Sequence, residues 1–457
     1  MFKHSVVAAM LAVSSAATAV EITVAPGSGL QAAIAAAADG DVIILQDGLY
    51  TNADPSIEVD KSLTFKAETA LANPIIQDAL YVPAAAAVTK LTLQGLQVDN
   101  ISVDSTATLG ELELLEVTLV DGQNSIRSAS QLRRFTLIGS TIPCNINTPT
   151  LYVEAGDITI AGNTICSSDL GGGSNLRTTS LGNETINFIG NSVTGQEGAT
   201  PMSVYAGAET LIVGNRFVEE WAPIGGTYSG GGDYTFILTG GSGRITLRNN
   251  LFQATTDRLA DPATTEVRRI SPMGVFGNAT SFIFENNVVD AANIAIWQPG
   301  VGETEQAGMI DSSNSWVPPS VSIRGNIFVN YNDNILPAPS TGVDLNAQNN
   351  ICFNNAVNCG TSNGNLASDP LFVDTVDYKP GTGSPAIDAG PSDAILSDLD
   401  TSRNDMGIYG GSWSIDQYDS QRDPAAVGPY IYSVLDTAKT VANGNVRVKF
   451  VSYGRQQ

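Results

Sequence analysis

A short phrase recurs between residues 159 and 352: two or three strand-forming residues, a small or polar residue, an asparagine, then an apolar pair. The aligned asparagines are Asn163, Asn191, Asn215, Asn250, Asn287, Asn326 and Asn350. A repeat that always restarts as a short strand and always bends at one residue type is typical of a parallel solenoid. Asparagine tolerates the left-handed backbone of a sharp corner, and stacked amides can hydrogen-bond at a spacing of about 4.8 Å. We therefore predict an all-β parallel β-helix with these asparagines along one corner, in preference to chance Asn-Gly turns in a β-sandwich.

Earlier segments extend this pattern towards the N-terminus. Residues 91–96, 112–117 and 135–140 match the phrase, with Leu96, Val117 and Ser140 at the asparagine position. A strand over residues 21–25 precedes a predicted amphipathic helix over residues 29–40, with Ser28 as its N-cap, that would cap the open end of the solenoid. The predicted organisation is a signal peptide over residues 1–19, a β-helix with its closing segment over residues 20–411, and a tail over residues 412–457. The tail would hold a β-hairpin with its turn at Asn443-Gly444.

The N-terminus predicts secretion. Lys3 and His4 precede an apolar stretch, and a small-residue cleavage site follows at Ala17-Thr18-Ala19. Its removal would take away His4, the one histidine in the chain, so that a histidine base or a histidine-ligated metal is excluded from the mature protein. The net charge of −24 argues against binding to nucleic acid or to anionic membranes.

Four cysteines in a secreted chain indicate disulfides. Cys144 and Cys166 are separated by about one repeat, so they would lie on neighbouring coils within bonding distance. Cys352 and Cys359 would close a small loop. The spacing of the repeat favours this pairing among the three that four cysteines allow.

The repeats lengthen between Asn215 and Asn326. Because the length of a coil is set by its geometry, the extra residues are expected to leave as three successive loops on one side of the helix, over residues 218–234, 253–269 and 290–319. Cations and aromatic rings gather there, which makes this cluster the predicted site: Trp221, Tyr228, Tyr234, Arg258, Arg268, Arg269 and Trp297.

The chain resembles the secreted right-handed parallel β-helix proteins of the pectate lyase-like superfamily. The resemblance is carried by the predicted capping helix, the asparagine-ended repeats and the sequence SPAIDAG at residues 384–390. It implies a protein that acts on or binds carbohydrate. A fainter similarity to the alginate lyase and chondroitinase B group rests on Asn250-Leu251-Phe252, followed downstream by Arg268-Arg269-Ile270-Ser271, although the lysine of that group's motif is absent.

A β-elimination on a uronate requires neutralisation of a carboxylate and removal of a proton. Arg268 or Arg269 would neutralise the carboxylate, Tyr228 or Tyr234 would transfer the proton, and Trp221, Arg258 and Trp297 would bind the polymer. Asp257, Asp261 and Glu266 would hold Ca²⁺ if it is used. The competing interpretation places the arginines on an exposed loop, paired with Glu266, in a non-catalytic protein that binds glycan or a protein partner. Asp398, Asp400 and Asp405 are a second candidate for Ca²⁺, with turn formation as the favoured alternative.

Overall fold

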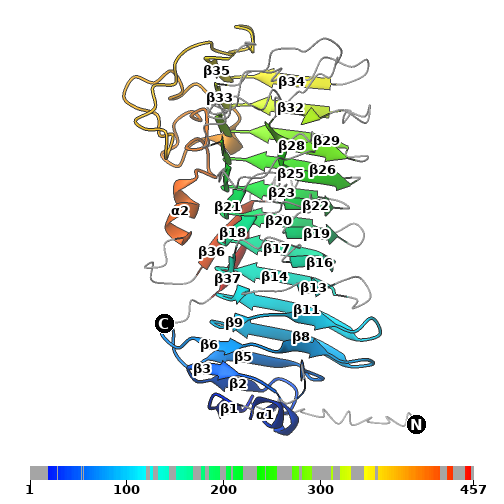
Figure 1. Ribbon diagram of the computed structural model, residues 1–457. Helices are drawn as coiled ribbons and strands as arrows, with labels where there is room; N and C mark the ends of the chain where they lie inside the picture. Colours follow the sequence, from blue (N-terminus) through cyan, green and yellow to red (C-terminus); the bar gives the residue numbers. More distant parts are fainter. Residues whose placement is uncertain are drawn as a thin grey trace, which may run out of the picture.

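The chain folds into a parallel β-solenoid, whose long stack of strands is visible in Figure 1. The computed structural model describes residues 19–27, 29–52, 54, 56–119, 124–126, 132–143, 151–167, 176–180, 185–195, 202–206, 209–219, 234–241, 243–254, 270–276, 280–290, 310–311, 320–330, 344–355, 359–422, 430–435 and 448–453. Within these residues, three parallel sheets of 13, 12 and 10 strands run the length of the stack, and we name them sheets A, B and C.

Each coil, meaning one turn of the solenoid, contributes a strand to more than one of these sheets. Sheet A contains β1 (Glu21–Val24), β2 (Val42–Leu45), β5 (Leu63–Ala67), β8 (Ala87–Gln94), β11 (Thr108–Leu115), β14 (Arg134–Ile138), β17 (Asp157–Ala161), β20 (Thr185–Ile189), β23 (Glu209–Val213), β26 (Arg244–Arg248), β29 (Ser281–Glu285), β32 (Ser320–Arg324) and β34 (Asp344–Gln348). Sheet B contains β3 (Gly48–Tyr50), β6 (Pro74–Ile76), β9 (Gln97–Val98), β12 (Thr118–Leu119), β15 (Thr141–Ile142), β18 (Thr164–Ser167), β21 (Ser192–Gly195), β24 (Arg216–Glu219), β27 (Leu251–Ala254), β30 (Val288–Asp290), β33 (Ile327–Val329) and β35 (Ile351–Phe353). Sheet C contains β4 (Ser56–Glu58), β7 (Ala79–Val82), β10 (Ile101–Val103), β13 (Asn124–Ile126), β16 (Leu151–Ala155), β19 (Leu176–Ser180), β22 (Met202–Ala206), β25 (Tyr234–Gly241), β28 (Ile270–Phe276) and β31 (Ile310–Asp311).

The predicted corner is confirmed by the hydrogen bonds of its asparagines. All seven are buried, with relative exposures of 0%. In each step the side-chain oxygen accepts from the backbone N–H and from the amide nitrogen of the preceding ladder residue, as Asn250 does from Asn215 at 3.0 and 2.9 Å. The Asn250 amide nitrogen donates to Ile212 O and to Asn287 Oδ1. From Asn191 to Asn350 each amide therefore uses both donors and accepts two hydrogen bonds, while Asn163 accepts one, from Ser140 N.

The ladder is longer than the repeat suggested. Ser140 begins it, because its backbone N–H donates to Asn163 Oδ1, and the Ser140 hydroxyl accepts from Val117 N. At the other end Asn350 donates to Asn365, a residue that the repeat alignment did not include. Register pairs such as Leu91 with Leu112, and Phe135 with Ile158, confirm that the earlier segments are coils of the same solenoid.

One part of the corner prediction was wrong. The left-handed backbone belongs to the residue before each ladder position, not to the ladder asparagine. Gly162, Gly190 and Gly214 have φ of +65°, +62° and +66°, and Asn249 and Asn286 take φ of +51° and +55° at the same place. The ladder asparagine thus serves hydrogen bonding, while the preceding glycine or asparagine makes the bend.

The solenoid interior is filled by the inward-facing residue of each strand. In the enlarged coils phenylalanines stack on one another: the ring centroids of Phe217 and Phe252 are 5.0 Å apart with planes 5° from parallel, and Phe284 and Phe328 continue the series. Phe217, Phe252 and Phe328 lie in one register row of sheet B, in which Val289 stands between the last two, and Phe284 of sheet A fills the place beside Val289 in the stack.

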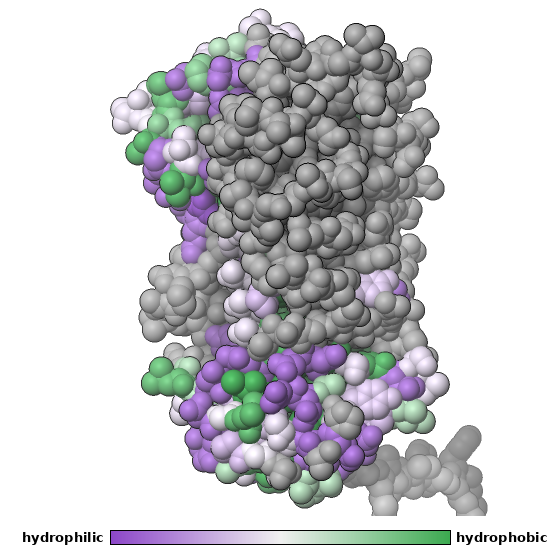
Figure 2. All heavy atoms as spheres, in the orientation of Figure 1, coloured by the Kyte–Doolittle hydropathy of each residue, from purple (hydrophilic) through white to green (hydrophobic). Residues whose placement is uncertain are grey.

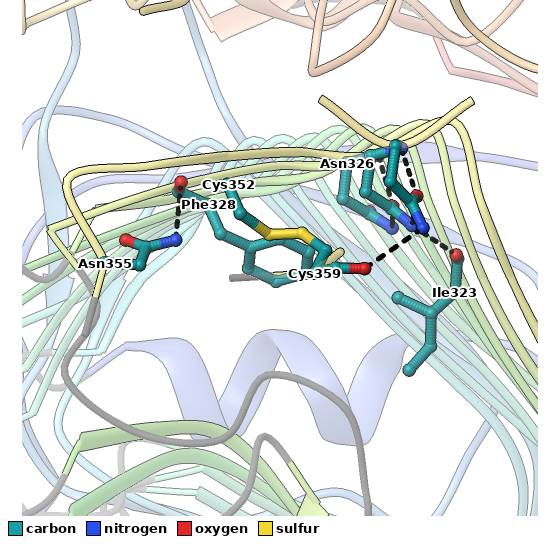
Figure 3. Close-up of a disulfide and its surroundings, with 8 residues drawn as sticks. Ile323, Asn326, Phe328, Cys352, Asn355 and Cys359 are labelled. Atoms are coloured by element: carbon teal, nitrogen blue, oxygen red, sulfur yellow. Dashed lines mark hydrogen bonds between the residues drawn. A yellow bond between two sulfur atoms is a disulfide. The ribbon is translucent and has the colours of Figure 1, made fainter. Parts of the chain in front are cut away.

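The Cys352–Cys359 disulfide confirms one predicted pairing. Figure 3 shows it beside Phe328, where Cys352 follows the phenylalanine row and Cys359 folds back over the core. Asn365 donates to Cys359 O, so the last ladder residue is tied to the same loop. Cys166 is also disulfide-bonded, whereas Cys144, its predicted partner, lies outside the described residues.

The N-terminal helix is shorter than predicted. Helix α1 spans Leu30–Ala36 rather than residues 29–40, and Leu30 and Ile34 enter the core. It ends early because Ala37 is extended, and Lys61 Nζ donates to the carbonyl oxygens of Ile34, Ala35 and Ala37 at this helix end. Asp41 binds the backbone N–H groups of Val20 and Ala38. Ser28 lies outside the described residues.

Residues 367–422, which we call the closing segment, add no parallel strand to the described sheets but run back along the outside of the solenoid (Figure 1). They include the 3₁₀ helix η3 (Ala394–Leu396) and helix α2 (Asp416–Arg422). Leu396, Trp413 and Tyr418 cover an outward row of small apolar residues on sheet A, and Tyr378, Met406 and Ile408 cover an outward row on sheet B. Gly214 is required beneath Tyr418, since a Cβ there would lie 2.1 Å from the tyrosine ring.

In the later coils, charged residues occupy the outward row of sheet A that holds apolar residues in the earlier coils. Glu285 is 1% exposed at its side chain and lies between Arg248 and Arg324, each within salt-bridge distance. Trp413 stacks on Arg248, with the guanidinium carbon 4.7 Å from the ring centroid, and Asp393 pairs with Arg324. Buried charges are tolerated only with partners, so this row fixes the position of the closing segment along the corner.

The tail contains an antiparallel pair. β36 (Tyr430–Leu435) pairs with β37 (Val448–Tyr453), from Tyr430 opposite Tyr453 to Leu435 opposite Val448. The turn predicted at Asn443-Gly444 lies outside the described residues.

A substitution in the ladder tests its contribution to stability. Asn250→Ala removes four hydrogen bonds, which leaves the backbone N–H of Asn215 without its acceptor and takes one of two donors from Asn287 Oδ1. We expect it to lower the free energy of unfolding by at least about 3 kcal/mol, measured by chemical denaturation. The control is Asn73→Ala, which removes one exposed hydrogen bond to Gln97 and should change stability little. Equal effects of the two substitutions would contradict the role assigned to the ladder.

Candidate functional site

Most residues of the predicted site lie outside the described part of the chain. These are Trp221, Tyr228, Arg258, Arg268, Arg269 and Trp297, together with the proposed calcium ligands Asp257, Asp261 and Glu266. Tyr234 is described as the first residue of β25. The strands on either side of the three enlarged connections are described, and they locate both ends of each connection.

The strands before the three connections are neighbours in one sheet, and the strands after them are neighbours in another. The connections begin after β24, β27 and β30, which pair successively in sheet B. They end at β25, β28 and β31, which pair successively in sheet C. Since neighbouring strands are about 4.8 Å apart, the three starting points follow one another along one edge and the three end points along another. All three connections thus bridge the same pair of sheets in consecutive coils.

The register also relates two of the predicted site residues. Tyr234 pairs with Ile270 across β25 and β28. Arg268 and Arg269 come directly before Ile270 in the sequence. Tyr234 is thus the register partner of the residue that follows the arginine pair in the sequence, and it is 34 and 35 positions from the two arginines in the chain.

The closing segment covers sheets A and B at this level of the solenoid. Gln253 in sheet B donates to Thr375 O at 3.1 Å, and Arg216 donates to Val376 O. On the sheet A side, Asn286 and Asn404 exchange amide hydrogen bonds of 2.7 and 3.0 Å, and Asn249 donates to Ile408 O. The described contacts of the closing segment therefore occupy the outward surfaces of sheets A and B, where its buried residues gather.

Sheet C presents outward tyrosines paired with carboxylates. In β7 the Tyr81 hydroxyl donates to Asp104 Oδ2 at 3.1 Å, and in β16 the Tyr152 hydroxyl donates to Glu154. The hydrogen bond to Asp104 raises the pKa of Tyr81, and the backbone N–H of Thr106 lowers the pKa of Asp104. Tyr81, Ser102, Ser125, Tyr152 and Arg177 follow one another in register along this sheet.

Such a row suits a linear sugar polymer in chemical terms. A half-buried tyrosine offers a ring face for stacking on a pyranose and an oriented polar group at its edge. Tyr81 and Tyr152 are three coils apart, or about 14 Å at the spacing of a parallel sheet. The strict alternation in residues 151–155, with Leu151 and Val153 buried and Tyr152 and Glu154 more exposed, is a signal in the sequence for this row, which the predicted site does not include.

The carboxylate cluster of the closing segment forms turns. Asp398 accepts from the backbone N–H groups of Asp405 and Gly411, and Asp400 accepts from Ser402 N at 2.9 Å. Asp405 accepts from Asp388 N at 2.7 Å. The described residues contain no group of three or more histidine, cysteine or acidic side chains arranged to hold a metal. These hydrogen bonds agree with the turn-forming interpretation of Asp398, Asp400 and Asp405.

Comparison with protein-family models and with curated proteins finds no match to this chain. Within the described residues, no helix is long and apolar enough to cross a membrane.

The pKa of Asp405 gives a pH-dependent prediction. Burial raises it to about 6, assisted by the charges of Asp398 and Asp388, so the folded protein retains a proton that the unfolded chain releases near pH 4. The protonated Asp405 carboxyl stabilises the folded protein fully at pH values below its pKa in the unfolded chain. This contribution is lost as pH rises through about 6. We expect Asp405→Asn to raise the free energy of unfolding by about 1 kcal/mol at pH 7.5, because solvent screens this half-buried group, and to have little effect at pH 4.

Asp400→Asn is the matched control. Hydrogen bonds from Ser402 lower the pKa of Asp400, so its charged form is favoured in the folded protein and its replacement should give no gain at pH 7.5. Both comparisons require only denaturation curves at the two pH values. A gain for Asp400→Asn that equals the gain for Asp405→Asn would show that net charge, rather than burial, is responsible.

Proposed function

We propose that this is a secreted, carbohydrate-associated β-helix protein that cleaves an acidic polysaccharide by β-elimination across the sheet C side of its enlarged coils. The observation that carries the proposal is the placement of the three long connections: all run from sheet B to sheet C in consecutive coils. A polymer lying along sheet C would cross the ends of all three. The fold is compatible with polysaccharide-related proteins, and the register partnership of Tyr234 and Ile270 supports convergence of tyrosine and arginine there.

The proposed chemistry follows the residue types. Arg268 or Arg269 neutralises the uronate carboxylate and thereby makes the C5 proton easier to remove. One of Tyr228 and Tyr234, as the tyrosinate, takes that proton; the C4–O bond breaks, a C4–C5 double bond forms, and the departing oxygen receives a proton from the hydroxyl of the other tyrosine. Trp221, Arg258 and Trp297 bind neighbouring sugars. Asp257, Asp261 and Glu266 would hold Ca²⁺, which would contribute further charge neutralisation.

Three structural expectations belong to the same proposal: cleavage of a signal peptide after Ala19, a right-handed solenoid, and a capping role for α1. The Cys352–Cys359 disulfide supports an oxidising compartment outside the cytosol. Burial of Leu30 and Ile34 of α1 in the core supports its role at the open end of the solenoid.

A second function, non-catalytic attachment to a glycan or a protein, is favoured by two surfaces. The tyrosine row of sheet C offers stacking positions without requiring any catalytic group. The closing segment, at the upper left of Figure 2, mixes hydrophilic and hydrophobic residues on its surface, and Val373 and Val376 are 68% and 71% exposed. Exposed apolar side chains of this kind are used in protein contacts, although single ones are common on any surface.

The double substitution Arg268→Ala/Arg269→Ala tests the lyase. Alginate, pectate and chondroitin are screened for the ultraviolet absorbance of new unsaturated ends, and the substitution is then measured on the polymer that reacts. Loss of the charge-neutralising arginines should lower turnover by at least about a hundredfold, with little change in thermal unfolding, because the surface-loop position that we propose for them would contribute little to stability.

The control is Arg133→Ala/Arg134→Ala, an adjacent arginine pair in earlier coils with side chains 70% and 52% exposed. It should retain full turnover. A non-catalytic protein would give no unsaturated product, and its glycan affinity would fall in a salt-dependent manner in the first double variant. Full turnover in that variant would place the chemistry elsewhere on the solenoid.

A further inference from the structure

Residues 375–378 of the closing segment, which we call the brace, contact three successive strands of sheet B. Arg216 of β24 donates to Val376 O at 3.3 Å and pairs with Asp377 Oδ1 at 3.1 Å. Gln253 of β27 donates to Thr375 O at 3.1 Å. Tyr378 donates its hydroxyl to Asp290 Oδ2 of β30 at 2.7 Å. A four-residue stretch thus bonds to one side chain from each of three neighbouring coils.

These three strands are the ones from which the enlarged connections begin. Asp290 is the last residue of β30, and Gln253 is the last but one of β27. Gln253 and Asp290 are direct register partners. Neighbouring outward positions on the same strands, Leu251 and Val288, pack in the apolar cluster that contains Tyr378. The polar contacts at Gln253 and Asp290 therefore lie at the carboxyl-terminal ends of β27 and β30, while Arg216, Leu251 and Val288 are contacted at the beginnings of β24, β27 and β30.

The brace is itself held in shape. Asp374 Oδ1 accepts from the backbone N–H groups of Val376 and Asp377 at 3.0 and 2.7 Å, and the Tyr409 hydroxyl donates to Asp377 O. Phe372 meets the Tyr378 ring edge-on, with centroids 5.2 Å apart. Tyr378 adopts φ of +57°, a backbone conformation that a tyrosine rarely takes unless its surroundings require it. Three independent contacts thus fix the conformation that presents residues 375–378 to sheet B.

The Tyr378–Asp290 contact is buried. Tyr378 is 1% exposed and Asp290 is 5% exposed, and Asn330 donates to the other carboxylate oxygen at 3.0 Å. Burial and the charge of Asp290 raise the pKa of Tyr378, so the hydroxyl keeps its proton and donates. A hydrogen bond to a buried carboxylate is among the stronger ones in a protein, and its loss leaves the charge poorly compensated.

We infer that the brace is a positioning element that holds together the three strands from which the enlarged connections begin and fixes the ends of β27 and β30, with Tyr378 and Asp290 as its central pair. Its effect on a ligand rests on the proposed function, because the polymer is proposed to cross the other ends of those connections in sheet C. Tyr378 is a positioning residue: it acts on the site through the strand ends and does not touch the polymer.

The test is Tyr378→Phe, which keeps the ring and removes only the hydroxyl. Hydrogen exchange of the full-length protein is followed at Gln253–Ala254 and Val289–Asp290, with the amides of β8 and β11 as an internal reference. We expect exchange at the strand ends to accelerate about fivefold or more, with the reference amides unchanged. The control is Ser384→Ala, which also removes a buried hydroxyl hydrogen bond of the closing segment, to Pro370 O, but does not reach sheet B.

Acceleration confined to the strand ends in Tyr378→Phe, and absent from Ser384→Ala, would support the inference. No change at the strand ends, or an equal increase over β8 and β11, would overturn it. Polymer affinity is measured on the same variants: a loss in Tyr378→Phe alone would link the brace to the site. If wild-type protein binds no acidic polysaccharide, the proposed function fails, while the exchange result still decides whether the brace holds the strand ends.

Discussion

From Ser140 to Asn365 the fold depends on one repeated interaction, the side-chain amide that joins a coil to its neighbours. At a sharp corner the backbone cannot satisfy all of its own hydrogen-bonding groups through the sheet ladders. The ladder asparagine accepts the backbone N–H of the preceding coil and donates to a carbonyl of that coil, as Asn215 does with Asn191 and Phe188. Because an unpaired buried polar group is costly, a side chain with two donors and two acceptors is suited to this place.

Two neighbouring residues share the corner: one makes the bend and the next, the ladder asparagine, makes the hydrogen bonds. The sequence had predicted both roles for the asparagine. The bend is made by the preceding residue, a glycine where space is smallest, as at Gly214 beneath Tyr418. Where the closing segment contributes polar groups instead, that position is an asparagine, and Asn249 and Asn286 donate to Ile408 O and Asn404 Oδ1. Whether glycine or asparagine precedes a ladder asparagine thus depends on whether an apolar ring or a polar group of the closing segment lies outside the corner.

The closing segment covers outward surfaces of sheets A and B, a difference between the outer faces of the solenoid that the repeat alone does not show. It buries the outward positions of sheet B in the later coils and the corner row of sheet A, ending at the charged series around Glu285. Sheet C, where the enlarged connections end, carries the half-buried tyrosines Tyr81 and Tyr152. The brace at residues 375–378 links the covered surface to the beginnings of those same connections.

The sequence by itself determined the solenoid, its corner and one disulfide, because a repeat places the same residue at the same geometric position in every coil. It also located the coils with excess residues. Only the tertiary structure decided the path of the closing segment and the contacts of Arg216, Gln253 and Asp290 with the brace, whose residues lie 88 to 161 positions away in the chain. Such contacts form between non-repeating side chains, so no spacing in the sequence encodes them, whereas the asparagine ladder is encoded by its period.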